Sequence, residues 1–131
     1  MSEVVTIFQN IRETNTPFHK EILFILDRIK KGNSKDLINS IRKVKDKQER
    51  NELKKNLPAI CFSGKFNKRN SESIQEHSGF ICLDFDGYEK KKELLQDKER
   101  FCKNTYVYSC FISPSGNGLK ALIKIPADIN N

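Results

Sequence analysis

The organisation of the chain depends on the stretch Phe80-Ile81-Cys82-Leu83-Asp84-Phe85-Asp86-Gly87. Side chains alternate between the two faces of a β-strand. Ile81, Leu83 and Phe85 fall on one wholly apolar face, which we expect to pack against a core. The opposite face starts with apolar residues and ends in Asp84 and Asp86. The pattern therefore predicts a strand over residues 80–86 whose last residues are acidic.

Asp84 and Asp86 form the first candidate site. Two positions along a strand separate them by about 6.6 Å on the same face. Aspartate is depleted in strands, and two unpaired carboxylates beside an apolar face repel each other and lose hydration. A pair at this spacing suits one divalent cation or the flanks of a phosphate group, so the pattern indicates a function and not packing alone.

Composition limits the possibilities for this chain. Its 131 residues, 37% of them hydrophobic, fit one domain, or one domain with an appendage. No apolar run is long enough to span a membrane, and the N-terminus has no secretory pattern. The four cysteines show no CxxC spacing, and Cys61, Cys82 and Cys110 lie in apolar runs, which favours core thiols over zinc ligands or disulfides. We therefore expect a cytoplasmic protein.

The net charge of +7 is concentrated in one segment. Residues 41–70 contain ten Lys and Arg against three Asp and Glu, and ten minus three equals the whole excess. Basic segments favour polyanions through counterion release. We predict nucleic-acid contacts at Lys54, Lys55, Lys65, Lys68 and Arg69. The alternative is a solvated helical face without a ligand.

The first part of the chain is predicted to be helical after one short strand, Val4–Phe8. Thr16 and Pro17 suit the start of a helix that Gly32 ends, and Ser34 can cap the next. These two helices would form a hairpin, and a basic helical piece follows from about residue 47 to 55. Residues 17–56 are thus the helical, basic portion of a single domain, 1–131.

Residues 57–126 are predicted to form the sheet. Strands are expected at 59–62, 80–86, 106–112 and 119–125, with the third in the sheet interior because it is apolar on both faces. We expect a loop at 65–70, a helical turn at 72–77 and a surface helix within 88–103. The fold class is α+β.

The second candidate site is the stretch from Ser113 to Lys120. Gly116 and Gly118 allow close approach of backbone N–H groups to a ligand, and Ser113 and Ser115 can donate to phosphate oxygens. Lys120 adds a positive charge. The stretch is not a Walker A loop, because Ala121 and a strand follow the lysine. Either it is an ordinary hairpin turn, or, beside the acidic pair, it holds a metal-bound nucleoside triphosphate.

Three blocks in order carry a family resemblance: residues 57–66, 77–86 and 112–120. Together they resemble the VirE N-terminal domain family, which is similar to the archaeo-eukaryotic primase superfamily, the primase-polymerases of plasmids, phages and other mobile elements. The resemblance extends over about residues 6–126.

This resemblance implies an RRM-like antiparallel or mixed sheet with packed helices, preceded by the helical hairpin. It implies that Asp84 and Asp86 bind Mg²⁺ or Mn²⁺ and act in catalysis, and that residues 113–120 bind a nucleoside triphosphate. Lys120 stands where classical primases have a histidine. The implied activity is template-directed nucleotidyl transfer on single-stranded DNA in phage or mobile-element replication, with a helicase domain or protein as partner.

The superfamily carries a third acidic ligand on a later strand, and Asp128 lies in a tail instead. Either the chain is the N-terminal part of a longer unit or it is not a complete enzyme.

Two other functions fit parts of the sequence. Leu83 to Gly87 also matches the Asp-x-Asp-Gly motif of haloacid-dehalogenase-type phosphatases, with Asp84 as nucleophile and Asp86 as general acid/base. Only about 45 residues follow that motif, few for the parallel sheet of such enzymes. The third possibility is a primase-related module that binds nucleic acid or a replication partner without catalysis.

Overall fold

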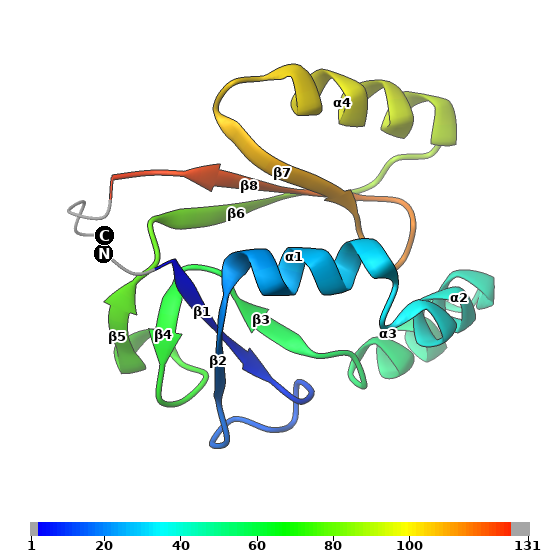
Figure 1. Ribbon diagram of the computed structural model, residues 1–131. Coiled ribbons are helices and arrows are strands. Elements are labelled where there is room, and N and C mark those ends of the chain that lie inside the picture. The colour runs from blue at the N-terminus through cyan, green and yellow to red at the C-terminus, as the bar shows by residue number, and fades with distance from the viewer. Residues whose placement is uncertain (1–2, 127–131) are drawn as a thin grey trace.

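The computed structural model describes residues 3–126 (Figure 1). The predicted α+β class is confirmed, but the strands form three small antiparallel sheets in place of one RRM-like sheet. The first has the order β2-β1-β3, with β1 at Val4–Phe8, β2 at Phe18–Glu21 and β3 at Ala59–Cys61. The second pairs β4, Gly64–Phe66, with β5, Ile74–His77. The third has the order β6-β8-β7, with β6 at Phe80–Phe85, β7 at Val107–Ile112 and β8 at Leu119–Lys124.

Four α-helices complete the described fold: α1 at Ile22–Lys31, α2 at Lys35–Lys43, α3 at Lys47–Lys54 and α4 at Lys91–Lys103. From top to bottom, Figure 1 shows α4, the third sheet, α1 and the first sheet. The core lies between the third sheet, α1 and the first sheet. It is built from Val5, Ile22, Ile25, Phe62, Phe80 and Leu122. No helix within residues 3–126 is long and apolar enough to cross a membrane.

The predicted orientation of β6 was wrong. Phe80 is fully buried in the core and Cys82 packs against it, so the face that ends in Asp84 is the one that points to the core. Leu83 and Phe85, on the opposite face, remain 41% and 36% exposed. The reason is that β6 is an edge strand, and α4 packs mainly over β7 and β8.

The order of the third sheet also differs from the prediction. The interior strand is β8, whereas β7 lies at an edge. β7 is apolar on both faces because α4 packs on one of them while Phe111, on the other, reaches the core and approaches Phe62 at 6.4 Å between ring centroids. Contact with two layers thus gives an edge strand the composition of a central one.

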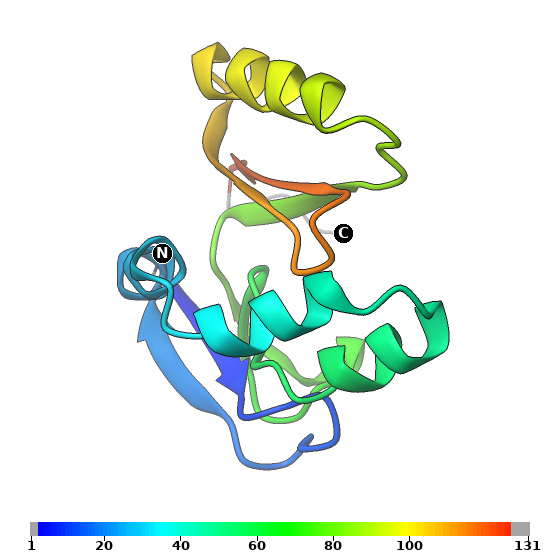
Figure 2. The same ribbon diagram turned by 90° about the vertical axis from the view of Figure 1, so that its right-hand side faces the viewer.

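The helix predicted from Thr16 and Pro17 begins later. Residues 18–21 pair with β1 as strand β2, so α1 starts at Ile22. A proline is as acceptable directly before a strand as at the start of a helix, so pairing with β1 determines that residues 18–21 form a strand. Gly32 does end α1, in the left-handed conformation with φ 73°. The predicted hairpin is wrong as well, because α2 packs mainly against α3 (Figure 2).

The segment predicted as a loop and a helical turn forms the second sheet. A short 3₁₀ helix occupies Ser71–Ser73, but residues 74–77 are strand β5 and residues 64–66 are strand β4. Lys65 pairs with Glu76 across this hairpin. The polar composition of the segment concealed two short strands whose partners lie close in the sequence.

Candidate functional site

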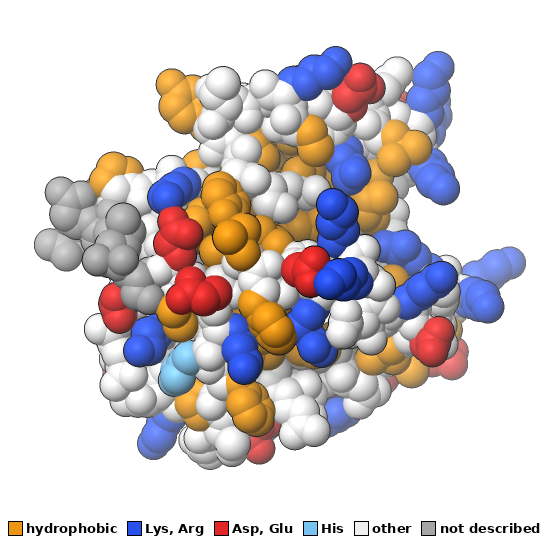
Figure 3. Space-filling model, viewed as in Figure 1, with side chains coloured by type: hydrophobic (Ala, Val, Ile, Leu, Met, Phe, Trp, Pro, Cys, Tyr) orange, Lys and Arg blue, Asp and Glu red, His pale blue; other side chains and the backbone are white. Residues whose placement is uncertain are grey.

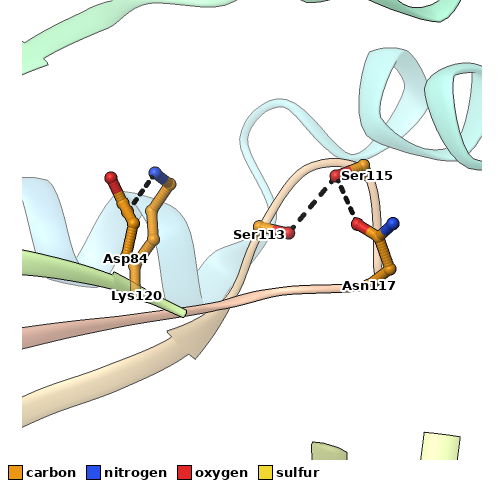
Figure 4. Close-up of polar contacts among 5 residues, drawn as sticks. All are labelled: Asp84, Ser113, Ser115, Asn117 and Lys120. Atoms are coloured by element: carbon orange, nitrogen blue, oxygen red, sulfur yellow. Dashed lines mark hydrogen bonds and ion pairs between the residues drawn. The ribbon is translucent and has the colours of Figure 1, made fainter. Parts of the chain in front are cut away.

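The acidic end of β6 lies directly beside Lys120 of β8. Asp84 and Lys120 are register partners on the two antiparallel strands. The Nζ of Lys120 donates to the Oδ1 of Asp84 at 2.7 Å, as Figure 4 shows. The pair stays accessible to solvent, with 52% of the Asp84 side chain and 32% of the Lys120 side chain exposed. Two residues chosen from separate motifs therefore meet at one place.

Asp86 follows the end of β6 and lies over the glycine loop. A Cβ atom at Gly118 would stand 2.7 Å from the Oδ1 of Asp86 and 3.0 Å from the Oγ of Ser113. Only glycine leaves room for this approach of the carboxylate to the chain. Asp86 itself is exposed. The structure thus brings Asp86, Ser113 and Gly118 together at the same end of the sheet as the Asp84–Lys120 pair.

The loop from residue 113 to 118 is a hairpin connection between β7 and β8. Ser113 N–H donates to the Gly118 carbonyl at 2.9 Å, and Gly116 N–H donates to the Ser113 carbonyl at 2.9 Å. The Oγ atoms of Ser113 and Ser115 lie 3.4 Å apart, and Ser115 donates to Asn117 at 2.9 Å (Figure 4). Gly116 adopts φ 83°, which favours glycine. The loop is therefore a tight turn, and its position beside Asp86 is what connects it to the candidate site.

Arg42 of α2 holds this loop from outside, a role that no sequence pattern indicates. Its Nε donates to the Pro114 carbonyl at 3.2 Å and a terminal nitrogen donates to the Ser113 carbonyl at 3.1 Å. The aliphatic part of Arg42 also lies against Gly116, where a Cβ would be 3.3 to 3.5 Å from Nε, Cδ and Cγ of the arginine. Figure 2 shows the β7–β8 loop directly above α2. A helix of the basic segment thus positions the loop.

An open groove of about 1120 Å³ extends from the Asp84–Lys120 pair toward α1 and β3. The wall at the sheet includes Cys82, Asp84, Phe111 and Lys120. Among the charged residues that line it are four cations, Lys20, Arg28, Arg69 and Lys120, and one carboxylate, Asp84. Four minus one leaves an excess of three positive charges, so the groove favours an anionic ligand.

A family model described as BT4734-like, N-terminal domain, matches residues 52–131. The chain belongs to this family. The match in this BT4734-like domain contains both candidate motifs and the whole third sheet. No curated protein and no solved structure matches the chain. The resemblance to the VirE and primase families, which the matched description does not mention, stays a prediction.

The five basic residues predicted to contact nucleic acid lie on different elements of the BT4734-like domain. Lys54 and Lys55 end α3, and Lys55 pairs with Glu52 at 2.7 Å. Lys65 is on β4, and Lys68 and Arg69 lie in the turn after it. Of these five, Arg69 alone lines the groove, and one of its terminal nitrogens donates to the Ile11 carbonyl at 2.6 Å.

The cysteines are free thiols. Burial, with a smaller contribution from the Asp84 carboxylate, raises the pKa of the Cys82 thiol beside the candidate site. Burial also raises the pKa of Cys61 and Cys110. These thiols stay protonated near neutral pH and are unsuited to nucleophilic chemistry.

Asp84 and Asp86 of the BT4734-like domain are candidate ligands for part of a metal site. Among residues 3–126 no group of three or more His, Cys, Asp or Glu side chains is placed to hold an ion. Asp128 lies outside the described residues. Asp84 and Asp86 are exposed oxygen donors at one end of the sheet. Mg²⁺ commonly takes one or two carboxylates and completes its shell with water and substrate phosphates, so the donor set fits a cation that arrives with a nucleotide.

Proposed function

We propose that this domain binds a nucleoside triphosphate with Mg²⁺ or Mn²⁺ as part of a primase-polymerase-like nucleotidyltransferase. The observation that carries the proposal is the meeting of Asp84 and Lys120 on adjacent strands at the edge of a positively charged groove. Asp86 and the Ser113–Gly118 loop lie at the same end of the sheet. Carboxylates for a cation and donors for phosphate are thereby combined at one place.

The side chains have distinct roles in this proposal. Asp84 and Asp86 would hold the cation, which supplies charge neutralisation of the triphosphate when bound. Lys120 would leave Asp84 and donate to a phosphate oxygen. An exposed ion pair contributes only about 0–1 kcal/mol, so breaking it costs little. The hydroxyl of Ser115 would leave Asn117 and donate to a further phosphate oxygen, and Arg42 would keep the loop in place.

The resemblance also guides what lies around the domain. It implies a single-stranded DNA template, a helicase partner and a role in phage or mobile-element replication. It implies a third acidic ligand as well. We include these in the proposal as expectations of the same resemblance.

A non-catalytic module that binds nucleic acid is the second candidate. The absence of a three-ligand cluster within residues 3–126, together with the positive groove, favours it. The phosphatase alternative receives less support. β6, which carries the acidic motif, pairs with an antiparallel neighbour, and every strand pair in the described part of the chain is antiparallel. That enzyme class is built on a parallel sheet.

Calorimetric titration with a nucleoside triphosphate, in the presence of Mg²⁺ or Mn²⁺ and after chelation with EDTA, tests the proposal. Binding should require the metal, and Asp84→Asn should weaken it at least tenfold. Asp36→Asn is the matched control, because it removes the same charge from an exposed position on α2. Nucleotide binding that persists without metal and is unchanged in Asp84→Asn would refute the assignment. Metal-independent affinity for nucleic acid without nucleotide binding would support the second candidate instead.

A further inference from the structure

An exposed aromatic ring on α1 lies among positive charges. Phe24 is 45% exposed, with the Nζ of Lys20 at 5.3 Å and the Cζ of Arg28 at 5.7 Å from its ring centroid. Phe18, on β2, is 52% exposed and two residues from Lys20, so both side chains leave the strand on the same face. We call Phe18, Lys20, Phe24 and Arg28 the aromatic strip. Figure 3 shows basic and apolar side chains next to one another over α1.

The aromatic strip continues into the candidate site. All four of its residues line the groove that reaches Asp84 and Lys120. The Asp84 carboxylate is already paired with Lys120, so the positive charges of Lys20 and Arg28 have no carboxylate among the groove-lining residues to neutralise them. A ligand of the whole groove must therefore offer negative charge along its length and flat apolar surfaces at intervals.

We propose that the aromatic strip binds single-stranded nucleic acid and leads it toward the Asp84–Lys120 pair. Exposed bases stack on aromatic side chains and on guanidinium planes, while neighbouring cations contact the phosphates. In a duplex the bases are stacked on one another in the interior, so they cannot stack on Phe18 and Phe24. The inference deepens the proposed function, on which it rests, by assigning the template strand a place. This place is on α1 and β2, separate from the predicted contacts Lys54 and Lys55 on α3.

Phe24→Trp gives a direct test because the chain contains no tryptophan. The substitution keeps an aromatic ring at an exposed position, so the fold should tolerate it. Oligothymidylate should quench the fluorescence of this single tryptophan as bases stack on it, and the quenching should saturate. Leu23→Trp is the matched control, since Leu23 is the adjacent residue of α1, 63% exposed and outside the groove lining. Equal quenching in both variants, or none in Phe24→Trp, would overturn the inference.

Fluorescence anisotropy with labelled oligothymidylate then separates stacking from charge. Phe24→Ala should weaken binding about 5- to 150-fold, the range for one lost base stack. The double variant Lys20→Gln/Arg28→Gln should reduce the slope of log affinity against log salt by about 1.4, because each phosphate contact on a single strand contributes about 0.7. Lys30→Gln/Lys31→Gln removes the same charge from α1 outside the groove and should leave most of the slope. An equal reduction of the salt slope in both double variants would overturn the inference.

The two proposals can fail separately. Asp84→Asn should lose metal-dependent nucleotide binding without losing affinity for oligothymidylate, because it removes the one carboxylate that lines the groove. Nucleotide binding that is intact in a protein with no affinity for oligothymidylate would overturn the aromatic strip alone. Strip-dependent binding of oligothymidylate without nucleotide binding would refute the nucleotide site and leave the strip supported. Tighter binding of a duplex than of the single strand would also overturn the inference.

Discussion

Replacing Arg42 with alanine should loosen the Ser113–Gly118 loop. The substitution removes two hydrogen bonds, at 3.2 Å to the Pro114 carbonyl and 3.1 Å to the Ser113 carbonyl. A hydrogen bond from a charged donor contributes about 1.5–3 kcal/mol when buried, and Arg42 is exposed. We therefore expect a loss of about 1–2 kcal/mol in the free energy of unfolding. For a chain of this size that corresponds to a fall of roughly 3–10 °C in Tm.

Circular dichroism melting and amide hydrogen exchange measure the two effects of Arg42→Ala. Exchange should accelerate at Ser113 and Gly116, whose N–H groups bond within the loop. Arg42→Lys keeps the charge but lacks the planar two-donor group, so it should recover only part of the loss. Lys43→Ala, at the exposed neighbouring position of α2, should change stability by less than about 0.5 kcal/mol. Unchanged exchange at both amides in Arg42→Ala would refute the positioning role.

Two further predictions concern the second sheet and the loop after β6. Gly64→Ala should destabilise the protein by about 3 kcal/mol or more, because the new Cβ would overlap the backbone carbonyl oxygen of Glu76. Gly87→Ala should cost about 1–2 kcal/mol, because Gly87 has φ 81° but nothing lies within 4 Å of a Cβ there. Urea unfolding of the two variants measures both losses. Burial, and then the hydrogen bond to Asp97, raise the pKa of Tyr88 to about 12. The stabilising contribution of this neutral phenol is complete below pH 10 and should disappear as the pH rises from 10 to 12. Asp97→Asn should lower that pKa in part, measured by phenolate absorbance, with Tyr88→Phe assigning the signal.

Local sequence patterns located both motifs of the candidate site, the acidic end of β6 and the stretch from Ser113 to Lys120. The alternation from Phe80 onward predicted β6, and the cluster of Ser, Pro, Gly and Asn predicted the turn before β8. Gly32 ended α1 as expected because a left-handed residue is a local requirement. The register that joins Asp84 to Lys120 was not predicted, yet it follows once β6 and β8 pair. Features that depend on a residue and its near neighbours were therefore predictable.

Structural features that depend on residues far away in the sequence could not be predicted. Residues 18–21 have a helical pattern that pairing with β1 overrides. The face of β6 that meets the core is decided by where α1 and the first sheet lie, and not by which face is more apolar. The partners of Arg42 are carbonyl oxygens 71 and 72 residues away, which any sequence would offer. The sequence therefore identified Arg42 as one of many basic residues and could not distinguish its role.

Because Asp84 pairs with Lys120, the acidic residues at the end of β6 do not by themselves require a ligand. Two unpaired carboxylates on a strand would be costly, but Lys120 neutralises Asp84 and Asp86 is exposed, so the cost alone no longer demands a ligand. What still favours one is location, because the pair lines a groove with excess positive charge. A cation that occupies the Asp84 carboxylate repels the Lys120 ammonium and opens the ion pair, which frees the N–H donor that bonded Asp84. A cation at Asp84 and a phosphate at Lys120 should therefore bind cooperatively, each favouring the state in which the ion pair is open. Positive coupling of this kind is expected of a site for a metal–nucleotide complex and not of a structural ion pair.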